Sequence, residues 1–138
     1  MSKSEPTIQK YMTVQPFEIG PAETLSKARD LFSKHGIRHL PVVDSGRVVG
    51  LLSDRDVKLA LGAVGADASR QTAGDVCVTD PYVVEPDDLL SEVARTMASR
   101  HYGSAVVVSN GKLVGIFTTV DACRALAEII ETRFHGRN

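Results

Sequence analysis

Apolar residues along the chain follow an order that predicts a helix, a hairpin and a second helix. Residues 25–35 carry apolar side chains at helical spacing, and Gly36 is expected to end that helix. The runs HLPVVD and VVGLLS then predict two strands joined by a turn at Gly46, where glycine tolerates a positive φ. These runs are continuous rather than alternating, which predicts strands covered on both faces or nearly so. A further helix is expected to begin at Asp54.

The same order returns in the second half of the chain. A helical stripe begins at Leu90, the runs SAVVVS and LVGIFT flank Gly111, and a final helix is expected over residues 119–134. In each half, a short helical turn (about 6–12 or 72–77) is expected to lead to a brief strand after Pro16 or Pro81, and the first long helix follows. The expected order of each half is therefore β-α-β-β-α.

A shift of 65 positions aligns the two halves without a gap. Of the 55 aligned positions from 7 to 61, 13 are identical, whereas average residue usage would give about one match in fifteen. We therefore predict an α/β (α+β) fold of two repeats, residues 7–65 and 72–132, with a Gly/Ala-rich linker at 62–74 and tails at 1–6 and 133–138. A repeat of about 60 residues buries too little surface alone, so we expect a pseudo-two-fold pair with two clefts between the repeats.

Composition narrows the class of protein. Hydrophobic residues make up 43% and charged residues 24% of the 138 residues, and the formal net charge is −1. These values favour a packed globular protein and give little support to nucleic acid as a partner. Cys77 and Cys123 are far apart and are expected to be small buried residues in a reducing compartment. The sequence shows no membrane-spanning run and no signal peptide, so we expect a cytoplasmic protein with no membrane partner.

Each repeat places Ser or Thr three residues before Asp at the start of its last helix. These residues are Ser53 and Asp56 in the first repeat, and Thr118 and Asp121 in the second. One interpretation is a capping box, in which the two side chains satisfy free backbone N–H groups. Another is a nucleotide site, because a carboxylate can accept hydrogen bonds from two vicinal ribose hydroxyls. The two interpretations are compatible and both stay open.

Arg38 and His39 distinguish the two repeats. They are either a solvated pair at a strand entrance or a phosphate contact, since Arg forms a bidentate fork and His adds a donor. The aligned residues of the second repeat are Gly103 and Ser104, which carry no charge. The site with Asp56 is therefore the better candidate for a phosphate.

The segments YMTVQPFEIGPAETLSKA, HGIRHLPVVDSGRVVGLLSDRD and VVVSNGKLVGIFTTVDACRAL, in this order and at this spacing, resemble the cystathionine-β-synthase (CBS) domain. Their tandem arrangement resembles the paired module called a Bateman module, over about residues 7–130. The resemblance implies a regulatory module rather than an enzyme. It implies an adenosine-containing ligand such as AMP, ADP, ATP, NAD or S-adenosylmethionine as a regulator, with no obligatory cofactor and no metal.

The resemblance also implies roles for individual residues. Asp56 and Asp121 would hold ribose hydroxyls, and Ser53 and Thr118 would lie near ribose or phosphate. The adenine side would be lined by the segments Thr13–Val14 and Val78–Thr79. Gly103 and Ser104 would offer backbone groups to the site of the other repeat. The cleft with Asp121 would then be empty, or would take its phosphates from Arg100, His101 or Arg55.

Two other functions remain as alternatives. The first is a structural dimerisation module without a ligand, since Ala122, Leu126, Ile129 and Ile130 predict an apolar helix face suited to a homodimer. The second is an uncharacterised enzyme, but the sequence has no nucleotide-binding glycine loop and no recognisable catalytic triad. The effector protein that would receive a signal is unknown, as is the ligand.

Overall fold

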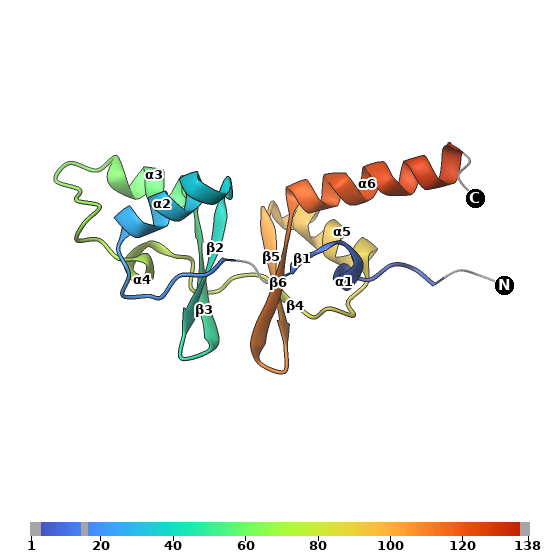
Figure 1. Cartoon of the computed structure of the whole chain (residues 1–138), viewed down its shortest axis with the longest axis horizontal. Coiled ribbons are helices and arrows are strands. Elements are labelled where there is room, and N and C mark those ends of the chain that lie inside the picture. The colour runs from blue at the N-terminus through green and yellow to red at the C-terminus, as the bar shows by residue number, and fades with distance from the viewer. Residues whose placement is uncertain (1–3, 15–16, 136–138) are drawn as a thin grey trace. The chain divides into compact units, whose positions relative to one another are not determined.

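The computed structural model describes residues 4–14 and 17–135. Within them it has six helices and six strands in an order that repeats once along the chain (Figure 1). The helices are α1 (Ile8–Tyr11), α2 (Leu25–His35), α3 (Asp54–Leu61), α4 (Ala73–Val76), α5 (Leu90–Arg100) and α6 (Thr119–Phe134). The strands are β1 (Thr13–Val14), β2 (His39–Asp44), β3 (Arg47–Ser53), β4 (Val83–Val84), β5 (Ser104–Ser109) and β6 (Lys112–Thr118).

The two long helices and the hairpin of each repeat are confirmed at the positions that the apolar pattern indicated, and β4 follows Pro81 as predicted. After Pro16, by contrast, residues 17–20 have only a single bridge, from Ile19 to Val42, and β1 lies before Pro16, where no strand was predicted.

Gly36 ends α2 in the left-handed conformation, with φ of 64°. Gly46 and Gly111 adopt φ of 81° and 78° in the two hairpin turns, as the turns require. The runs of buried residues in β2 and β5 agree with strands that are covered on both faces.

The chain forms two compact units that do not coincide with the two sequence repeats. One unit contains residues 1–15, 82–110 and 114–138, and the other contains residues 16–81 and 111–113. We call them the Asp121 unit and the Asp56 unit after the aspartate that each contains. The segment that begins the first repeat, as far as Val14, thus belongs to the unit built on the second repeat, a connection that the repeat pattern did not reveal.

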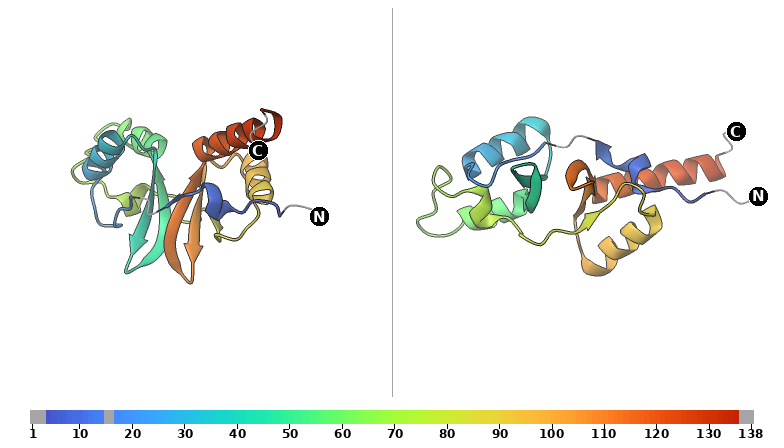
Figure 2. Two further views of the ribbon diagram at one scale, coloured as in Figure 1. Left: turned by 45° about the vertical axis from the view of Figure 1, so that its right-hand side comes forward. Right: turned by 90° about the horizontal axis from the view of Figure 1, so that it is seen from below.

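The Asp121 unit contains a four-stranded sheet in the order β1-β6-β5-β4. Strand β1 is antiparallel to β6, with Thr13 opposite Ile116, and β4 is parallel to β5. Helices α5 and α6 belong to the same unit, and the second half of α6 extends along the N-terminal segment in both views of Figure 2. The core is closed by Ile8 of α1, which is fully buried with Val107 and Phe117.

The Asp56 unit repeats this plan with shorter pairings. Strands β2 and β3 form an antiparallel hairpin, and single bridges join Val78 to Leu51 on one side and Ile19 to Val42 on the other. These bridges match the β1–β6 and β4–β5 pairings of the Asp121 unit position for position. Ala73 of α4 closes this core, as Ile8 does in the other unit.

Close approach between segments explains the glycine in VVGLLSDRD and LVGIFTTVD. A Cβ placed on Gly50 would lie 2.6 Å from Cys77 Sγ and 2.8 Å from the Val78 carbonyl oxygen. A Cβ on Gly115 would lie 2.7 Å from Met12 Sδ and 2.9 Å from the Thr13 carbonyl oxygen. The glycine therefore lets another segment of the chain, residues 77–78 or 12–13, pack closely against the strand that contains the glycine.

Candidate nucleotide site and family membership

The structure divides the sequence-predicted site residues between the two units. Ser53, Asp56, Arg38, His39 and the segment 78–79 lie in the Asp56 unit. The other set lies in the Asp121 unit and comprises Thr118, Asp121, Gly103, Ser104, Thr13 and Val14. Each aspartate thus lies in the same unit as a short segment from the start of the other repeat, Thr13–Val14 with Asp121 and residues 78–79 with Asp56.

Asp121 is engaged by hydrogen bonds and is only 3% exposed. Its carboxylate accepts a hydrogen bond from the Thr118 backbone N–H at 3.0 Å, while Thr118 Oγ1 accepts from the Asp121 N–H. The capping box is therefore complete. Arg124 Nη1 donates to Asp121 Oδ1 at 3.1 Å, and the Thr13 hydroxyl donates to the same carboxylate at 3.2 Å.

Asp56 has a different environment although it occupies the same position in its repeat. Ser53 Oγ accepts a hydrogen bond from the Asp56 backbone N–H at 3.0 Å, so half of the capping box is present. Within residues 4–14 and 17–135, no hydrogen bond or ion pair engages the Asp56 carboxylate. The two additional partners of Asp121 have no equivalent here, because Val78 aligns with Thr13 and Leu59 aligns with Arg124.

His39 and Cys77 lie within the electrostatic influence of Asp56. Burial lowers the pKa of His39, Asp56 opposes that effect, and Arg38 adds to it. Burial also raises the pKa of the Cys77 thiol, and the negative charge of Asp56 acts in the same direction. A thiol with a raised pKa is a weak nucleophile, so Cys77 is poorly suited to covalent catalysis.

A hollow of about 380 Å³ on the Asp56 unit has His39 in its lining, whereas Asp56 and Cys77 are not among the residues that line it. It is lined by Arg38, His39, Ser53, Asp54, Arg55, Lys58 and Leu59. The cations outnumber the single carboxylate, Asp54, which pairs with Lys58 at 3.0 Å. The hollow therefore combines positive charge with the start of α3, where free backbone N–H groups also favour an anion. Lys58 was not among the predicted site residues, because an exposed cation on a helix gives no signal in the sequence. Arg55 was predicted only as a phosphate contact of the cleft with Asp121, whereas the structure places it in the lining of this hollow on the Asp56 unit.

The aligned positions of the Asp121 unit carry no such charge. Ser104 takes the position of His39 and is 3% exposed, and its hydroxyl has no hydrogen-bond partner in the described part of the chain. Gly103 takes the position of Arg38, and its carbonyl oxygen accepts a hydrogen bond from the Thr119 N–H, as that of Arg38 does from Asp54. The two units thus have the same backbone hydrogen bond at this position, but only the Asp56 unit has charged side chains there.

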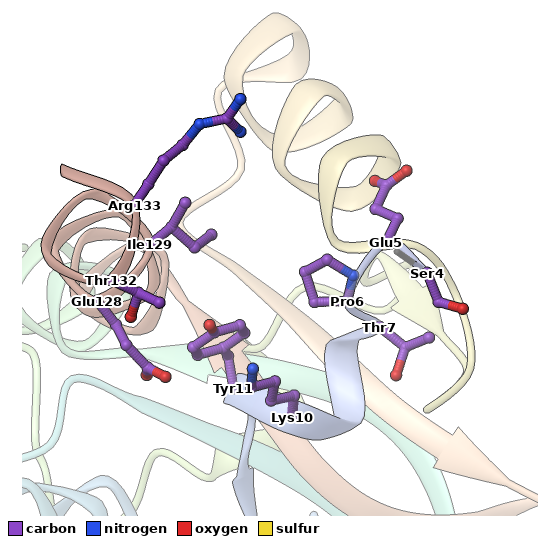
Figure 3. A pocket seen from close by; sticks show the side chains of 10 residues that line it. All are labelled: Ser4, Glu5, Pro6, Thr7, Lys10, Tyr11, Glu128, Ile129, Thr132 and Arg133. Carbon is purple, nitrogen blue, oxygen red and sulfur yellow. The ribbon is translucent and has the colours of Figure 1, made fainter. Parts of the chain in front are cut away.

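The largest hollow described in the structure lies elsewhere, on the Asp121 unit. It measures about 910 Å³ and separates the N-terminal segment and α1 from the second half of α6 (Figure 3). Glu5, Lys10, Glu128 and Arg133 line it from different sides, so charges of both signs alternate around a wide opening. Lys10 Nζ lies 5.4 Å from the centre of the Tyr11 ring. No predicted site residue lines this hollow, and its mixed charges do not converge on one point.

Two further observations concern the described residues as a whole. No helix in residues 4–14 and 17–135 is long and apolar enough to span a membrane. In the same residues, no group of three or more His, Cys, Asp or Glu side chains is placed to hold a metal ion.

Comparison with known proteins identifies the repeats. The model of the CBS domain matches residues 8–63 and again residues 73–128. Hypoxic response protein 1 of Mycobacterium tuberculosis is 33% identical over 111 residues, which cover 80% of this chain and 78% of the relative. CBS domain-containing protein YhcV of Bacillus subtilis is 29% identical over 115 residues, covering 83% and 81% of the two chains.

Solved structures agree with this assignment. AcuB from Vibrio cholerae superposes with a TM-score of 0.87 at 28% identity and covers 98% of this chain and 100% of its own. CBSX2 from Arabidopsis thaliana, solved in complex with AMP, superposes with a TM-score of 0.79 at 26% identity and covers 90% and 98%. Proteins built of a CBS pair are regulatory modules. The chain belongs to the CBS domain family and carries two CBS domains in tandem.

Proposed function

We propose that this CBS pair is a regulatory sensor that binds an adenosine-containing ligand at the Asp56 site. The observation that carries the proposal is the unengaged carboxylate of Asp56 beside Arg38 and His39, at a position where the other repeat has a fully engaged carboxylate. Two vicinal hydroxyls of a ribose are suitable donors for such a carboxylate. The AMP complex of CBSX2, at 26% identity, supports the choice of an adenosine ligand.

The phosphate of the ligand would lie in the hollow lined by Arg38, His39 and Arg55. An arginine fork and a second donor are suited to a phosphate, and the start of α3 adds positive potential. Val78 and Thr79 would lie on the adenine side. Val78 pairs with Leu51 on the strand that leads to Asp56, and 49% of its surface is exposed, so an apolar surface is available next to the carboxylate.

Calorimetric titration with AMP, ADP, ATP, NAD and S-adenosylmethionine tests the proposal. We expect Asp56→Asn to weaken binding by about 10- to 100-fold, because a hydrogen bond to a charged group contributes about 1.5–3 kcal/mol. Arg47→Gln, an exposed substitution at the first residue of β3 and outside the lining of the hollow, is the control and should leave affinity unchanged. Failure of all five compounds to bind at millimolar concentration would overturn the proposal.

We further propose that the signal passes to a second copy of the chain through α6. The side chains of Leu126, Ile129, Ile130 and Phe134 are between 38% and 74% exposed on this helix. Beside them, an apolar groove of about 320 Å³ runs between α5, α6 and Pro6. Light scattering after chromatography tests this part, and we expect Ile129→Glu to convert a dimer into a monomer without loss of folding. A monomeric wild-type chain would contradict it.

A structural role without a ligand is the alternative function, and one observation favours it. The complete capping box of Thr118 and Asp121 supports it, because both side chains satisfy backbone N–H groups at the start of a helix. In that case a dimer would form without any ligand, and Asp56→Asn would change no affinity.

A further inference from the structure

A second hollow adjoins the phosphate side of the Asp56 site. It has a volume of about 480 Å³ and lies at the C-terminal end of α2, where Arg29, Ser33 and Gly36 line it. Arg38, Asp54 and Lys58 line both this hollow and the one beside His39. We call them the outer and the inner hollow. Because they share three lining residues, a chain-like ligand in the inner hollow can extend directly into the outer one.

The two hollows together are strongly basic. Arg29, Arg38, Arg55 and Lys58 face one carboxylate, that of Asp54. Asp54 is paired with Lys58, and in the described residues no ion pair involves any of the three arginines. An arginine with no carboxylate partner keeps its full set of donors for a phosphate, which it binds in a bidentate fork.

The fold does not require these four cations. In the second repeat the aligned residues are Ala94 for Arg29, Gly103 for Arg38, Val120 for Arg55 and Cys123 for Lys58. The backbone around them is the same, including the hydrogen bond that joins residue 38 or 103 to the start of the last helix. All four charges are therefore additions to one repeat, which indicates a binding role for them rather than a structural one.

We infer that the outer hollow binds the phosphates beyond the first in a polyphosphate chain, so that the site prefers a nucleoside triphosphate to a monophosphate. This inference rests on the proposed function. Arg38, at the boundary of the two hollows, contacts both the inner and the outer phosphates. Arg29 lines the outer hollow alone and contacts only the outer phosphates, so it sets the preference for the longer chain. Lys58 lines both hollows and, like Arg38, contacts the inner and the outer phosphates.

Calorimetric titration with AMP, ATP and inorganic tripolyphosphate tests the inference on the full chain and on Arg29→Gln, Lys58→Gln and the control Arg47→Gln. We expect the wild type to bind ATP more tightly than AMP. Arg29→Gln should weaken ATP binding by about 3- to 10-fold, since the side chain is exposed and partly screened, and should leave AMP binding unchanged. Amide chemical shifts of Ser33, Gly36 and Ile37 should move with ATP and not with AMP. Thermal unfolding of each variant confirms that it is folded.

The outcomes separate this inference from the proposed function. Equal affinity for AMP and ATP, with no effect of Arg29→Gln, overturns the inference and leaves the adenosine site in place. Binding of tripolyphosphate that depends on Arg29, without binding of either nucleotide, supports the outer hollow as a polyphosphate site and overturns the nucleotide as its source. If neither Arg29→Gln nor Lys58→Gln changes the affinity for ATP or for tripolyphosphate, the inference is contradicted altogether.

Discussion

The two CBS domains of this chain have the same backbone plan. They differ in the residues around the repeated Ser/Thr-x-x-Asp sequence at the start of the last helix. In the Asp121 unit, the aspartate is buried and engaged by Thr13, Thr118 and Arg124. In the Asp56 unit, the same position carries a partly exposed aspartate whose negative charge raises the pKa of the nearby His39 against the effect of burial. One carboxylate is therefore held by hydrogen bonds within its own unit, whereas in residues 4–14 and 17–135 no hydrogen bond or ion pair engages the other.

The surfaces formed by the two helix pairs differ in the same way. The hollow at α2 and α3 is lined by Arg29, Arg38 and Lys58, whereas the groove at α5 and α6 is lined by alanine, leucine and isoleucine side chains. A basic surface favours a small anion, and an apolar one favours a protein partner. The two repeats thus combine one backbone plan with surfaces of different chemical character.

The largest effect that we predict concerns the stability of the two aspartate variants. Asp121→Ala should lower the free energy of unfolding by about 2–4 kcal/mol, because it removes a cap and leaves the Thr13 and Arg124 donors without their acceptor. Asp56→Ala should cost less than about 1 kcal/mol, since its carboxylate engages no such partners. Denaturant unfolding of both variants measures the difference. Equal losses would mean that the two carboxylates have the same structural role.

Gly50 and Gly115 occupy equivalent close contacts in the two units, so the same substitution should have the same effect at both. Gly50→Ala and Gly115→Ala should each cost about 1–3 kcal/mol, because each added Cβ meets a backbone oxygen and a sulfur atom at less than 3 Å. Denaturant unfolding measures both losses. Gly46→Asn, in the hairpin turn, is a suitable control because asparagine tolerates a positive φ. A large loss of unfolding free energy at only one of the two glycines would show that the two close contacts are not equivalent.

Thr13 distinguishes the segment beside Asp121 from the equivalent segment beside Asp56, which has Val78 at the aligned position. Thr13→Val should lower the free energy of unfolding by about 1 kcal/mol, the usual contribution of one hydrogen bond. The matched variant is Val78→Thr, which introduces the hydroxyl beside Asp56. We expect it to change stability less and to weaken ligand binding, because the new donor would compete with the ribose for the carboxylate. An increase in nucleotide affinity in Val78→Thr would contradict this.

Most of the fold follows from the sequence because helices, strands and turns depend on local pattern. The turns at Gly46 and Gly111 and the helix end at Gly36 were predicted from residues within a few positions. The hydrogen bond from Thr13 to Asp121 was not, because it joins residues 108 positions apart. The internal repeat shows that Thr13 and Val78 are equivalent, but it does not show onto which repeat each one packs.

The candidate site was predicted to a similar extent. Asp56, Arg38 and His39 were identified because the two repeats could be compared residue by residue. Arg29 and Lys58 were missed, because an exposed cation on a helix is ordinarily a solvated residue, and neither the sequence spacing nor the resemblance indicates that α2 and α3 bring both to one hollow. The engaged state of Asp121 also needed the structure, since the sequence left capping and binding equally open.

The smallest predicted effect is a pH dependence that belongs to the Asp56 unit alone. Burial lowers the pKa of His39, so the unfolded chain binds more protons than the folded chain below the ordinary histidine pKa of about 6.5. The free energy of unfolding should therefore fall as the pH decreases below that value. His39→Gln should remove this part of the dependence, which unfolding curves measured between pH 7 and pH 5 would detect.

A bound phosphate would favour the charged imidazole, so ligand binding should take up a proton at His39 and strengthen as the pH falls. Ser104 at the aligned position cannot titrate, so a pH dependence that persists in His39→Gln would contradict the assignment of this effect to the Asp56 site.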